Sequence, residues 1–245
     1  MTNPLYYCLR RGQAAAAAGG APVATITHSD AATFSTTRLR GASGQSLFFD
    51  PGNGDAPDEI VMAGAGVDSN WSKAYLTGEE KTVQISGALS DLETFWLYEP
   101  TISRVDLTLL TGVLNLSLSL GQVDTMDRLP PNVAVLRFIG NQMTSLDSFS
   151  GLPLDDMSLV RIDGNPIIYT TQTFPAVNGG EFDFSDTVTT TGEVDNWIMD
   201  LSVGNAEWQN TTTNLAGTNP ARSSASDAEV AWFVTIGGNA LTINE

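Results

Sequence analysis

The sequence is poor in cysteine, histidine and basic residues, and each shortage excludes a class of structure or partner. Cys8 is the single cysteine and His28 the single histidine among 245 residues. One cysteine allows no disulfide within the chain and no cysteine-based zinc site, whereas a disulfide between two chains stays open. The 11 basic residues stand against 28 acidic residues, which gives a net charge of −17. Such a field repels phosphate backbones and anionic lipid, so we expect no nucleic-acid partner.

Long hydrophobic runs are also missing, as are the signatures of common nucleotide and zinc sites. No stretch approaches the roughly 18 apolar residues of a membrane helix, so we expect no membrane span. Neither the phosphate loop GxxxxGK[ST] nor the zinc motif HExxH occurs. Arg10 and Arg11 precede an alanine run, but the more apolar residues 5–9 stand on the wrong side of them for an export signal. We therefore interpret residues 1–21 as an N-terminal arm.

A repeat of about 21 residues dominates the sequence after residue 88. From Val133, the text VAVLRFIGNQMTSLDSFSGLP fits the frame LxxLxLxxNxLxxLxxLxxL, with Asn141 in the asparagine position. MSLVRIDGNPI repeats the frame with Asn165, while VLNLSLSLGQV and LETFWLYEPTISRV carry Gly121 and Pro100 there. The units begin at residues 92, 113, 133, 157 and 179. We expect each unit to supply one strand of a stacked parallel sheet, with the asparagines satisfying backbone groups where the chain turns.

Two segments flank the repeats. Residues 22–87 contain the alternating runs VATIT, SLFF, EIVMA and KTVQIS, which predict a small β-module. Residues 179–245 predict a C-terminal cap with a helix over GEVDNWIMDLSVG that stops at Gly204 and a second helix with Ser226 as its N-cap. Two strands, near 213–216 and 241–243, complete the cap. The repeats and the cap together cover residues 88–245.

Residues 92–166 resemble bacterial leucine-rich repeats of the internalin and BspA kind. The words GEVDNWIMDL, NLAGTNPARSSASDAEVAWF and LTIN resemble the terminal unit of repeat proteins from tailed bacteriophages and related bacterial surface proteins. The stretch from FFDPGNGD to KTVQISG is weakly similar to a PKD-like β-module, with residues 50–55 in place of its WGDG turn. These resemblances imply a β-dominated α/β solenoid of the leucine-rich-repeat class, closed by a helix-containing cap.

Residues with catalytic or metal-binding chemistry are few. His28 could belong to a triad assembled in space, but no nucleophile motif stands near it in the sequence. The acidic loop offers oxygen ligands of the kind that Ca²⁺ takes, although its spacing departs from an EF-hand. Its oxygen-bearing residues are Asp50, Asn53, Asp55 and Asp58. We expect no catalytic residue, no bound metal and no cofactor, and leave calcium as an open alternative.

The strand alternation points to a more informative set of residues. If the apolar positions of each repeat point inward, the residues between them point out onto one face, one for each strand. These residues are Trp96, Ser117, Arg137, Arg161 and Asp183, with Tyr98 beside them. Trp, Tyr and Arg together are typical of binding hot spots. In the alternative reading the arginines simply pair with Asp163 and Asp183, and the N-terminal module covers Trp96.

We expect a non-enzymatic structural or binding component of a tailed-bacteriophage virion, either a tail or baseplate fibre or a capsid-decoration protein. Its partners would be other virion proteins, or a receptor or glycan on the host surface during host attachment. Self-association stays open. The first alternative is a bacterial cell-surface leucine-rich-repeat adhesin, which an export signal would favour. The second is a glycan-active enzyme, which turnover dependent on His28 would favour.

Overall fold

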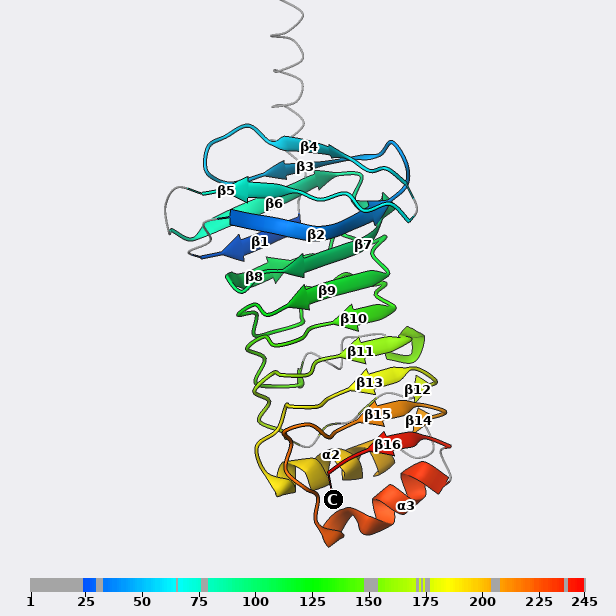
Figure 1. Cartoon of the computed structure of the whole chain (residues 1–245). Helices are drawn as coiled ribbons and strands as arrows, with labels where there is room; N and C mark the ends of the chain where they lie inside the picture. Colours follow the sequence, from blue (N-terminus) through cyan, green and yellow to red (C-terminus); the bar gives the residue numbers. More distant parts are fainter. Residues whose placement is uncertain are drawn as a thin grey trace, which may run out of the picture.

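The computed structural model describes most of the chain after the N-terminal arm. The described residues are 24–29, 33–64, 66–75, 79–147, 154–170, 172, 174, 177–203, 208–235 and 238–244. The predicted arm, Cys8 and Gly204 therefore lie outside the described residues. The protein is a β-dominated α/β protein with a mostly parallel nine-stranded sheet, a small antiparallel sheet and two helices near the C-terminus (Figure 1).

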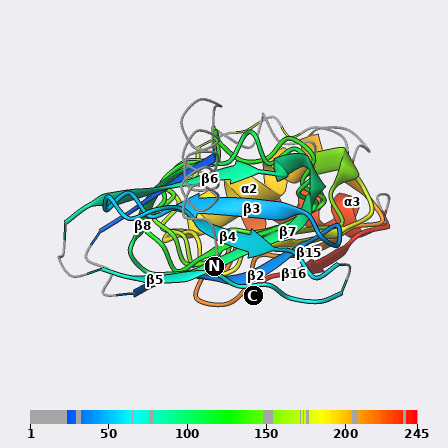
Figure 2. The ribbon, with the colours of Figure 1, turned by 90° about the horizontal axis from the view of Figure 1, so that it is seen from above.

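The small antiparallel sheet has five strands in the order β4-β3-β6-β1-β8. Their bounds are β1 Ala24–His28, β3 Ser46–Asp50, β4 Asp58–Val61, β6 Lys81–Gly87 and β8 Ile102–Asp106. Alternate residues of β1 and β3 are buried, as the alternating sequence runs predict. Seen from above, this sheet lies over the stack of parallel strands (Figure 2). The last strand, β8, comes from residues that follow the predicted β-module.

The nine-stranded sheet runs in the order β16-β15-β13-β11-β10-β9-β7-β2-β5. Its strands are β2 Thr33–Gly41, β5 Ser72–Ala74, β7 Leu92–Tyr98, β9 Asn115–Ser119, β10 Val135–Arg137, β11 Leu159–Arg161, β13 Glu181–Asp183, β15 Thr212–Asn214 and β16 Ala240–Thr242. The strands from β7 to β16 are parallel, whereas β2 and β5 pair antiparallel at one edge. Each repeat therefore supplies one parallel strand.

The register of the parallel strands brings the repeated apolar residues into one buried row. Leu116 pairs with Phe95 on one side and with Leu136 on the other, and Val160 follows Leu136. All four side chains are 0% exposed. The prediction that these positions lie on neighbouring strands is confirmed. Burial of each large apolar side chain in such a row stabilises the fold by about 1.5–3 kcal/mol. A one-residue slip would turn these side chains to the other face, so their burial determines the register.

Buried asparagines satisfy backbone groups between successive repeats. Asn165 donates from Nδ2 to the carbonyl oxygens of Phe138 and Ile162, both at 2.7 Å, and its Oδ1 accepts from the amide of Met143 at 3.2 Å. Asn141 donates to the carbonyl of Leu118 at 2.8 Å. The structural role predicted for these two asparagines is confirmed. Two asparagines nearer the C-terminus, which the sequence frame did not single out, donate in the same way: Asn219 and Asn239.

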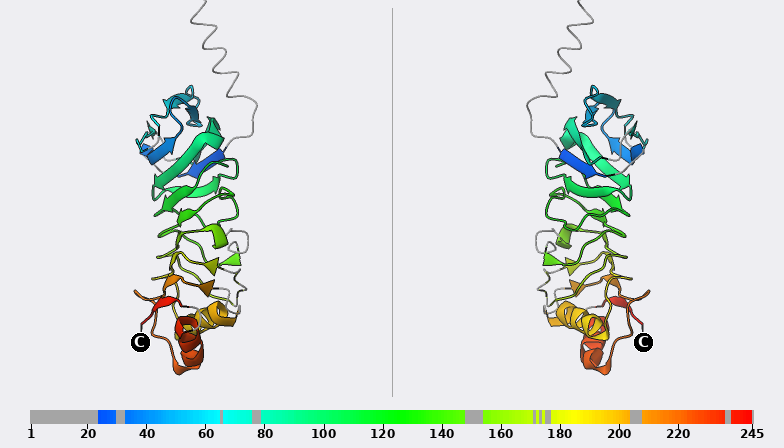
Figure 3. Two further views of the ribbon diagram at one scale, coloured as in Figure 1. Left: turned by 90° about the vertical axis from the view of Figure 1, so that its right-hand side faces the viewer. Right: turned by 90° about the vertical axis from the view of Figure 1, so that its left-hand side faces the viewer.

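The C-terminal end carries the two predicted helices, α2 Thr191–Val203 and α3 Asp227–Thr235. Side views place both helices at the end of the molecule opposite the antiparallel sheet (Figure 3). Short elements complete the chain: β12 Val177–Asn178 and β14 Trp208–Gln209 form a two-stranded parallel sheet, and the 3-10 turns are η1 Leu89–Asp91, η3 Leu154–Asp156 and η4 Ser224–Ser226. Trp197 of α2 is buried and stacks on Tyr169 at 4.6 Å between ring centroids, so the helix packs against the segment that follows β11.

The prediction of Ser226 as a helix N-cap is wrong. Because η4 lengthens the helical segment ahead of α3, the cap moves back to Ser223, whose Oγ accepts from the amide of Ala225 at 3.1 Å. Ser226 is buried and donates instead to Asp195 at 2.6 Å. Its hydroxyl thus ties the second helical segment to α2.

Candidate functional site

The outward-facing residues of the parallel strands form a single row across the nine-stranded sheet. Trp96 pairs with Ser117, Ser117 with Arg137, Arg137 with Arg161, and Arg161 with Asp183. At the other end Arg38 of β2 pairs with Trp96. Tyr98 pairs with Ser119 two residues further along the strands and is 57% exposed. The structure therefore brings together the residues singled out from the sequence, and adds Arg38.

Trp96 lies between two arginine side chains. The Cζ of Arg38 is 4.0 Å from the centroid of the indole ring, and the Cζ of Arg137 is 5.4 Å from it. Both are cation–π distances. Asn115 holds the group from one side, because its Oδ1 accepts from Trp96 Nε1 at 2.9 Å and from Arg137 Nη1 at 3.2 Å. The alternative interpretation expected the N-terminal module to cover Trp96. This is observed in part, because Arg38 of β2 lies over Trp96 and leaves it half-buried.

Ser117 points to this face but is only 6% exposed. Trp96 and Arg137 stand on the two strands beside it, and their side chains approach each other to 5.4 Å. Strands in a sheet are about 4.8 Å apart, so these two side chains bridge over the strand between them. Ser117 therefore lies beneath the surface, where its Oγ is 3.1 Å from the Oγ of Ser119.

Arg161 and Arg137 differ in their charge partners. Arg161 donates to both oxygens of Asp163, at 3.1 and 3.2 Å, and lies 3.3 Å from Asp183. This pairing is the one that the alternative reading expected. Arg137 has no carboxylate within ion-pair distance among the described residues. Burial lowers the pKa of Arg137, and the nearby charges of Arg161 and Arg38 lower it further, against the opposing effect of Glu181.

His28 lies in the core, 1% exposed, between two aromatic rings. Its ring stacks on Phe34 at 4.7 Å and meets Tyr75 edge-on at 4.7 Å between centroids. Among the described residues, neither ring nitrogen finds a hydrogen-bond partner. Burial lowers the pKa of His28, and the charge of Lys81 adds to this effect. A general base needs a nucleophile within hydrogen-bond reach and access for a substrate, and the described surroundings of His28 offer neither.

The acidic loop is held by contacts within the protein. Lys73 lies 3.0 Å from Asp55 and 3.8 Å from Asp58, and Trp71 donates from Nε1 to Asp58 at 2.9 Å. Asn53 donates to Asp55 at 3.0 Å. An ammonium group therefore occupies the place where the carboxylate oxygens converge. Within the described ranges, no three histidine, cysteine, aspartate or glutamate side chains gather as metal ligands would.

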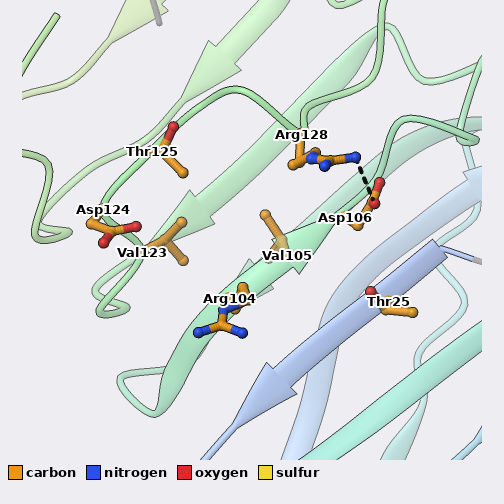
Figure 4. A pocket seen from close by; sticks show the side chains of 8 residues that line it. All are labelled: Thr25, Arg104, Val105, Asp106, Val123, Asp124, Thr125 and Arg128. Atoms are coloured by element: carbon orange, nitrogen blue, oxygen red, sulfur yellow. Dashed lines mark hydrogen bonds and ion pairs between the residues drawn. The ribbon is translucent and has the colours of Figure 1, made fainter. Parts of the chain in front are cut away.

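A cavity of about 390 Å³ lies beside β8, and its lining includes none of the residues of the sheet face just described (Figure 4). Val105 and Val123 form its apolar floor. Arg128 forms an ion pair with Asp106 at the rim, with 3.3 Å between Arg128 Nη1 and Asp106 Oδ2. The remaining lining residues are Thr25, Arg104, Asp124 and Thr125. The lining carries both arginine and aspartate side chains, so it favours neither an anionic nor a cationic ligand.

No described helix has the length and apolar character needed to cross a membrane. Comparisons of the chain with protein-family models, with curated proteins and with solved structures found no match.

Proposed function

We propose that the chain is a leucine-rich-repeat solenoid that binds a macromolecular partner through the outer face of its nine-stranded sheet and catalyses no reaction. One observation carries this proposal: the outward residues of five successive strands, from β7 to β13 in sheet order, lie in register, and they are Trp96, Ser117, Arg137, Arg161 and Asp183. A stacked sheet presents an extended, rigid surface of this kind, because each repeat adds one residue to the same row. Trp and Arg are also the residues in which binding energy concentrates.

The repeat spacing supports the leucine-rich-repeat assignment. Units of 20 to 24 residues, from start to start, each carry one parallel strand and a return through less regular chain. This spacing falls within the period of that architecture. The buried asparagines at the strand exits perform the backbone function that the repeat frame assigns to them. The open end of the stack is covered by α2 and α3, as terminal units of such proteins require.

The proposed setting is the virion of a tailed bacteriophage, in the tail, the baseplate or the head decoration. The support is the resemblance of the C-terminal unit to the terminal units of phage repeat proteins. The partner is then another virion protein or a host surface receptor. A bacterial surface adhesin would use the same sheet face, and the two settings differ in where the protein is found.

The non-enzymatic part of the proposal is supported by the environment of the sole histidine. His28 is enclosed by Phe34 and Tyr75, and no nucleophile is hydrogen-bonded to it in the part of the chain that the structure describes. Turnover of host-surface polysaccharide that disappears with His28→Ala, while the fold is retained, would contradict this part.

Two measurements test the binding proposal. Immunolabelling electron microscopy of purified phage particles tests whether the protein is part of the virion, and we expect the particles to be labelled. Label on the surface of the bacterial cells and none on the particles would favour the adhesin. Association of the purified chain with particles and with host cells checks the face. We expect the double variant Trp96→Ala with Arg137→Ala to weaken association by about thirtyfold or more, since hot-spot residues contribute at least about 2 kcal/mol.

Arg128→Ala is the matched control for this experiment, because Arg128 is an exposed arginine on the rim of the cavity beside β8. We expect it to bind like the wild-type chain. Equal association of all three proteins would remove the sheet face as the binding surface.

A further inference from the structure

The charges on the sheet face are unevenly compensated. Arg38 and Arg40 share one carboxylate, that of Asp68, with 3.2 Å between Arg38 Nε and Asp68 Oδ2. Arg137, two strands beyond Trp96 in the sheet, has no carboxylate among the described residues. The end of the face formed by β2, β7, β9 and β10 therefore has more guanidinium groups than carboxylates. The whole chain, by contrast, carries a net charge of −17. A local excess of positive charge in so acidic a protein needs a physical reason.

Fold stability supplies only a small part of that reason, because the cation–π contact of Arg137 with Trp96, at 5.4 Å from Cζ to the ring centroid, contributes only about 0.5–1 kcal/mol. A half-buried cation without a counter-ion costs free energy, because it loses hydration and gains no ion pair. Burial and the neighbouring guanidinium groups of Arg161 and Arg38 lower the pKa of Arg137, and the charge of Glu181 opposes them without cancelling the shift. A neutral polar side chain at this position could keep the hydrogen bond to Asn115 without that cost, and would lose only the cation–π contact. An external carboxylate would instead convert the unfavourable charge into an ion pair.

We propose that this end of the sheet face binds an acidic segment of a partner protein, with a carboxylate of that segment paired to Arg137. The inference rests on the proposed function and names the chemistry of the partner. A carboxylate fits the planar donors of a guanidinium group, which can bind both of its oxygens. Arg38, which shares the carboxylate of Asp68 with Arg40, lies on the other side of Trp96 and attracts a second acidic group along the row.

The neighbouring side chains favour a protein over a polysaccharide. Val135 and Leu159 pair with each other on the same face and are half-buried, and Tyr98 is exposed. Apolar and aromatic residues beside arginine are typical of the core of protein interfaces. The indole ring of Trp96, on which a sugar could stack, is already covered by Arg38 at 4.0 Å. The face therefore offers apolar contact and guanidinium groups, and little free aromatic platform.

The other end of the row determines where the segment lies. Asp163 and Asp183 both face Arg161, and Glu181 is exposed on the strand beyond. These carboxylates repel an acidic segment, so we place it over β2, β7, β9 and β10. The same arrangement disfavours binding of a basic partner at Arg137.

The test uses the full chain with two probes of equal charge, a glutamate oligomer and an oligogalacturonate, measured by isothermal titration calorimetry at low salt. We expect the glutamate oligomer to bind more tightly and its binding to weaken as salt is added. Arg137→Gln should reduce its affinity at least about thirtyfold, the lower end of the effect of removing one partner of a close charge pair. Arg137→Lys keeps the charge but not the planar donors and should give an intermediate loss.

Arg128→Gln makes the same change in net charge away from the face and should leave the affinity unchanged. Near-ultraviolet circular dichroism of each variant confirms that it folds. No binding of the glutamate oligomer, equal losses in Arg137→Gln and Arg128→Gln, or tighter binding of the oligogalacturonate would each overturn the proposal. If these probes fail while Trp96→Ala still abolishes association with particles or cells, the sheet face binds its partner without this carboxylate, and the proposed function survives.

Discussion

His28 is a polar residue held in an apolar environment, and this makes the stability of the protein depend on pH. The folded chain keeps the imidazole neutral, because burial disfavours its charged form and lowers its pKa. The unfolded chain takes up a proton at His28 as the pH falls through about 6.5. Below that pH the unfolded state binds more protons than the folded state, so the free energy of unfolding decreases with falling pH.

We predict that His28→Phe weakens this dependence. Phenylalanine fits the aromatic contacts with Phe34 and Tyr75 and carries no titrating group. The contribution of His28 is at most about 1.4 kcal/mol for each pH unit below its unfolded pKa. Urea unfolding at about pH 7.5 and pH 5 measures it, and the many carboxylates shared by both proteins cancel in the difference. An identical loss of stability in both proteins between these values would contradict the prediction.

The sequence predicts whether a side chain is buried or faces outward wherever the residue lies in the repeat frame. The buried row through Leu116 and Leu136 follows from spacing alone, and so does the facing direction of Arg137, because parallel strands one repeat apart stack in register. Arg38 could not be predicted. It comes from an antiparallel strand far earlier in the chain, and no sequence period connects it to Trp96. The low exposure of Ser117 depends on how long neighbouring side chains fold over it, which alternation does not encode.

At the scale of single elements, α2 begins with reciprocal hydrogen bonds between Thr190 and Glu193. The amide of Glu193 donates to Thr190 Oγ1 at 3.2 Å, and Glu193 Oε2 accepts from the amide of Thr190 at 2.9 Å. The second oxygen, Oε1, accepts from the amide of Tyr169 at 3.1 Å. Glu193 thus satisfies helix-end donors and also ties α2 to the preceding unit. Burial raises the pKa of Glu193, but these hydrogen bonds outweigh it and leave the pKa lowered.

We predict that Glu193→Ala lowers the free energy of unfolding by about 1–2 kcal/mol, the range for loss of a helix cap. Glu193→Gln keeps one acceptor oxygen and should cost less. Because the folded pKa is lowered, the contribution of the charged form is present above the unfolded pKa and is lost as pH falls below it. Urea denaturation at neutral pH measures both variants, with Glu80→Ala, an exposed glutamate, as the control. A Glu193→Ala loss no larger than that of Glu80→Ala would count against the cap.

The sequence predicted the strands of the repeats and both helices, but some elements and boundaries escaped it. The pattern Thr-x-x-Glu that caps α2 is visible at Thr190 and Glu193, and it is the signal that would have located the start of the helix. Strand β2 breaks strict alternation, because its pairing with β7 shifts register between Thr36 and Arg38. Strand β5 has three residues, too few for a periodic pattern. Both strands depend on partners distant in the sequence, which local patterns do not specify.

At the scale of the whole molecule, the stacking of strands produces an elongated shape (Figure 1). A compact chain of 245 residues would have a radius of gyration of about 18 Å. We predict a clearly larger value by small-angle X-ray scattering, because nine strands stacked about 4.8 Å apart extend in one direction, with a further sheet and two helices at the ends. A variant that begins at Pro22 controls for residues 1–21. A radius near 18 Å for that variant would be inconsistent with the stacked arrangement.

If the row on the sheet face binds a partner as proposed, recognition is separable from folding. Each strand of the stack contributes inward side chains that bury against its neighbours and an outward one that takes part in little of that packing, as Leu136 and Arg137 illustrate. A change of outward residue therefore alters a single step of the surface, while the interior keeps its shape. On the proposed function, specificity can therefore change one strand at a time, without a change in the core that supports the row.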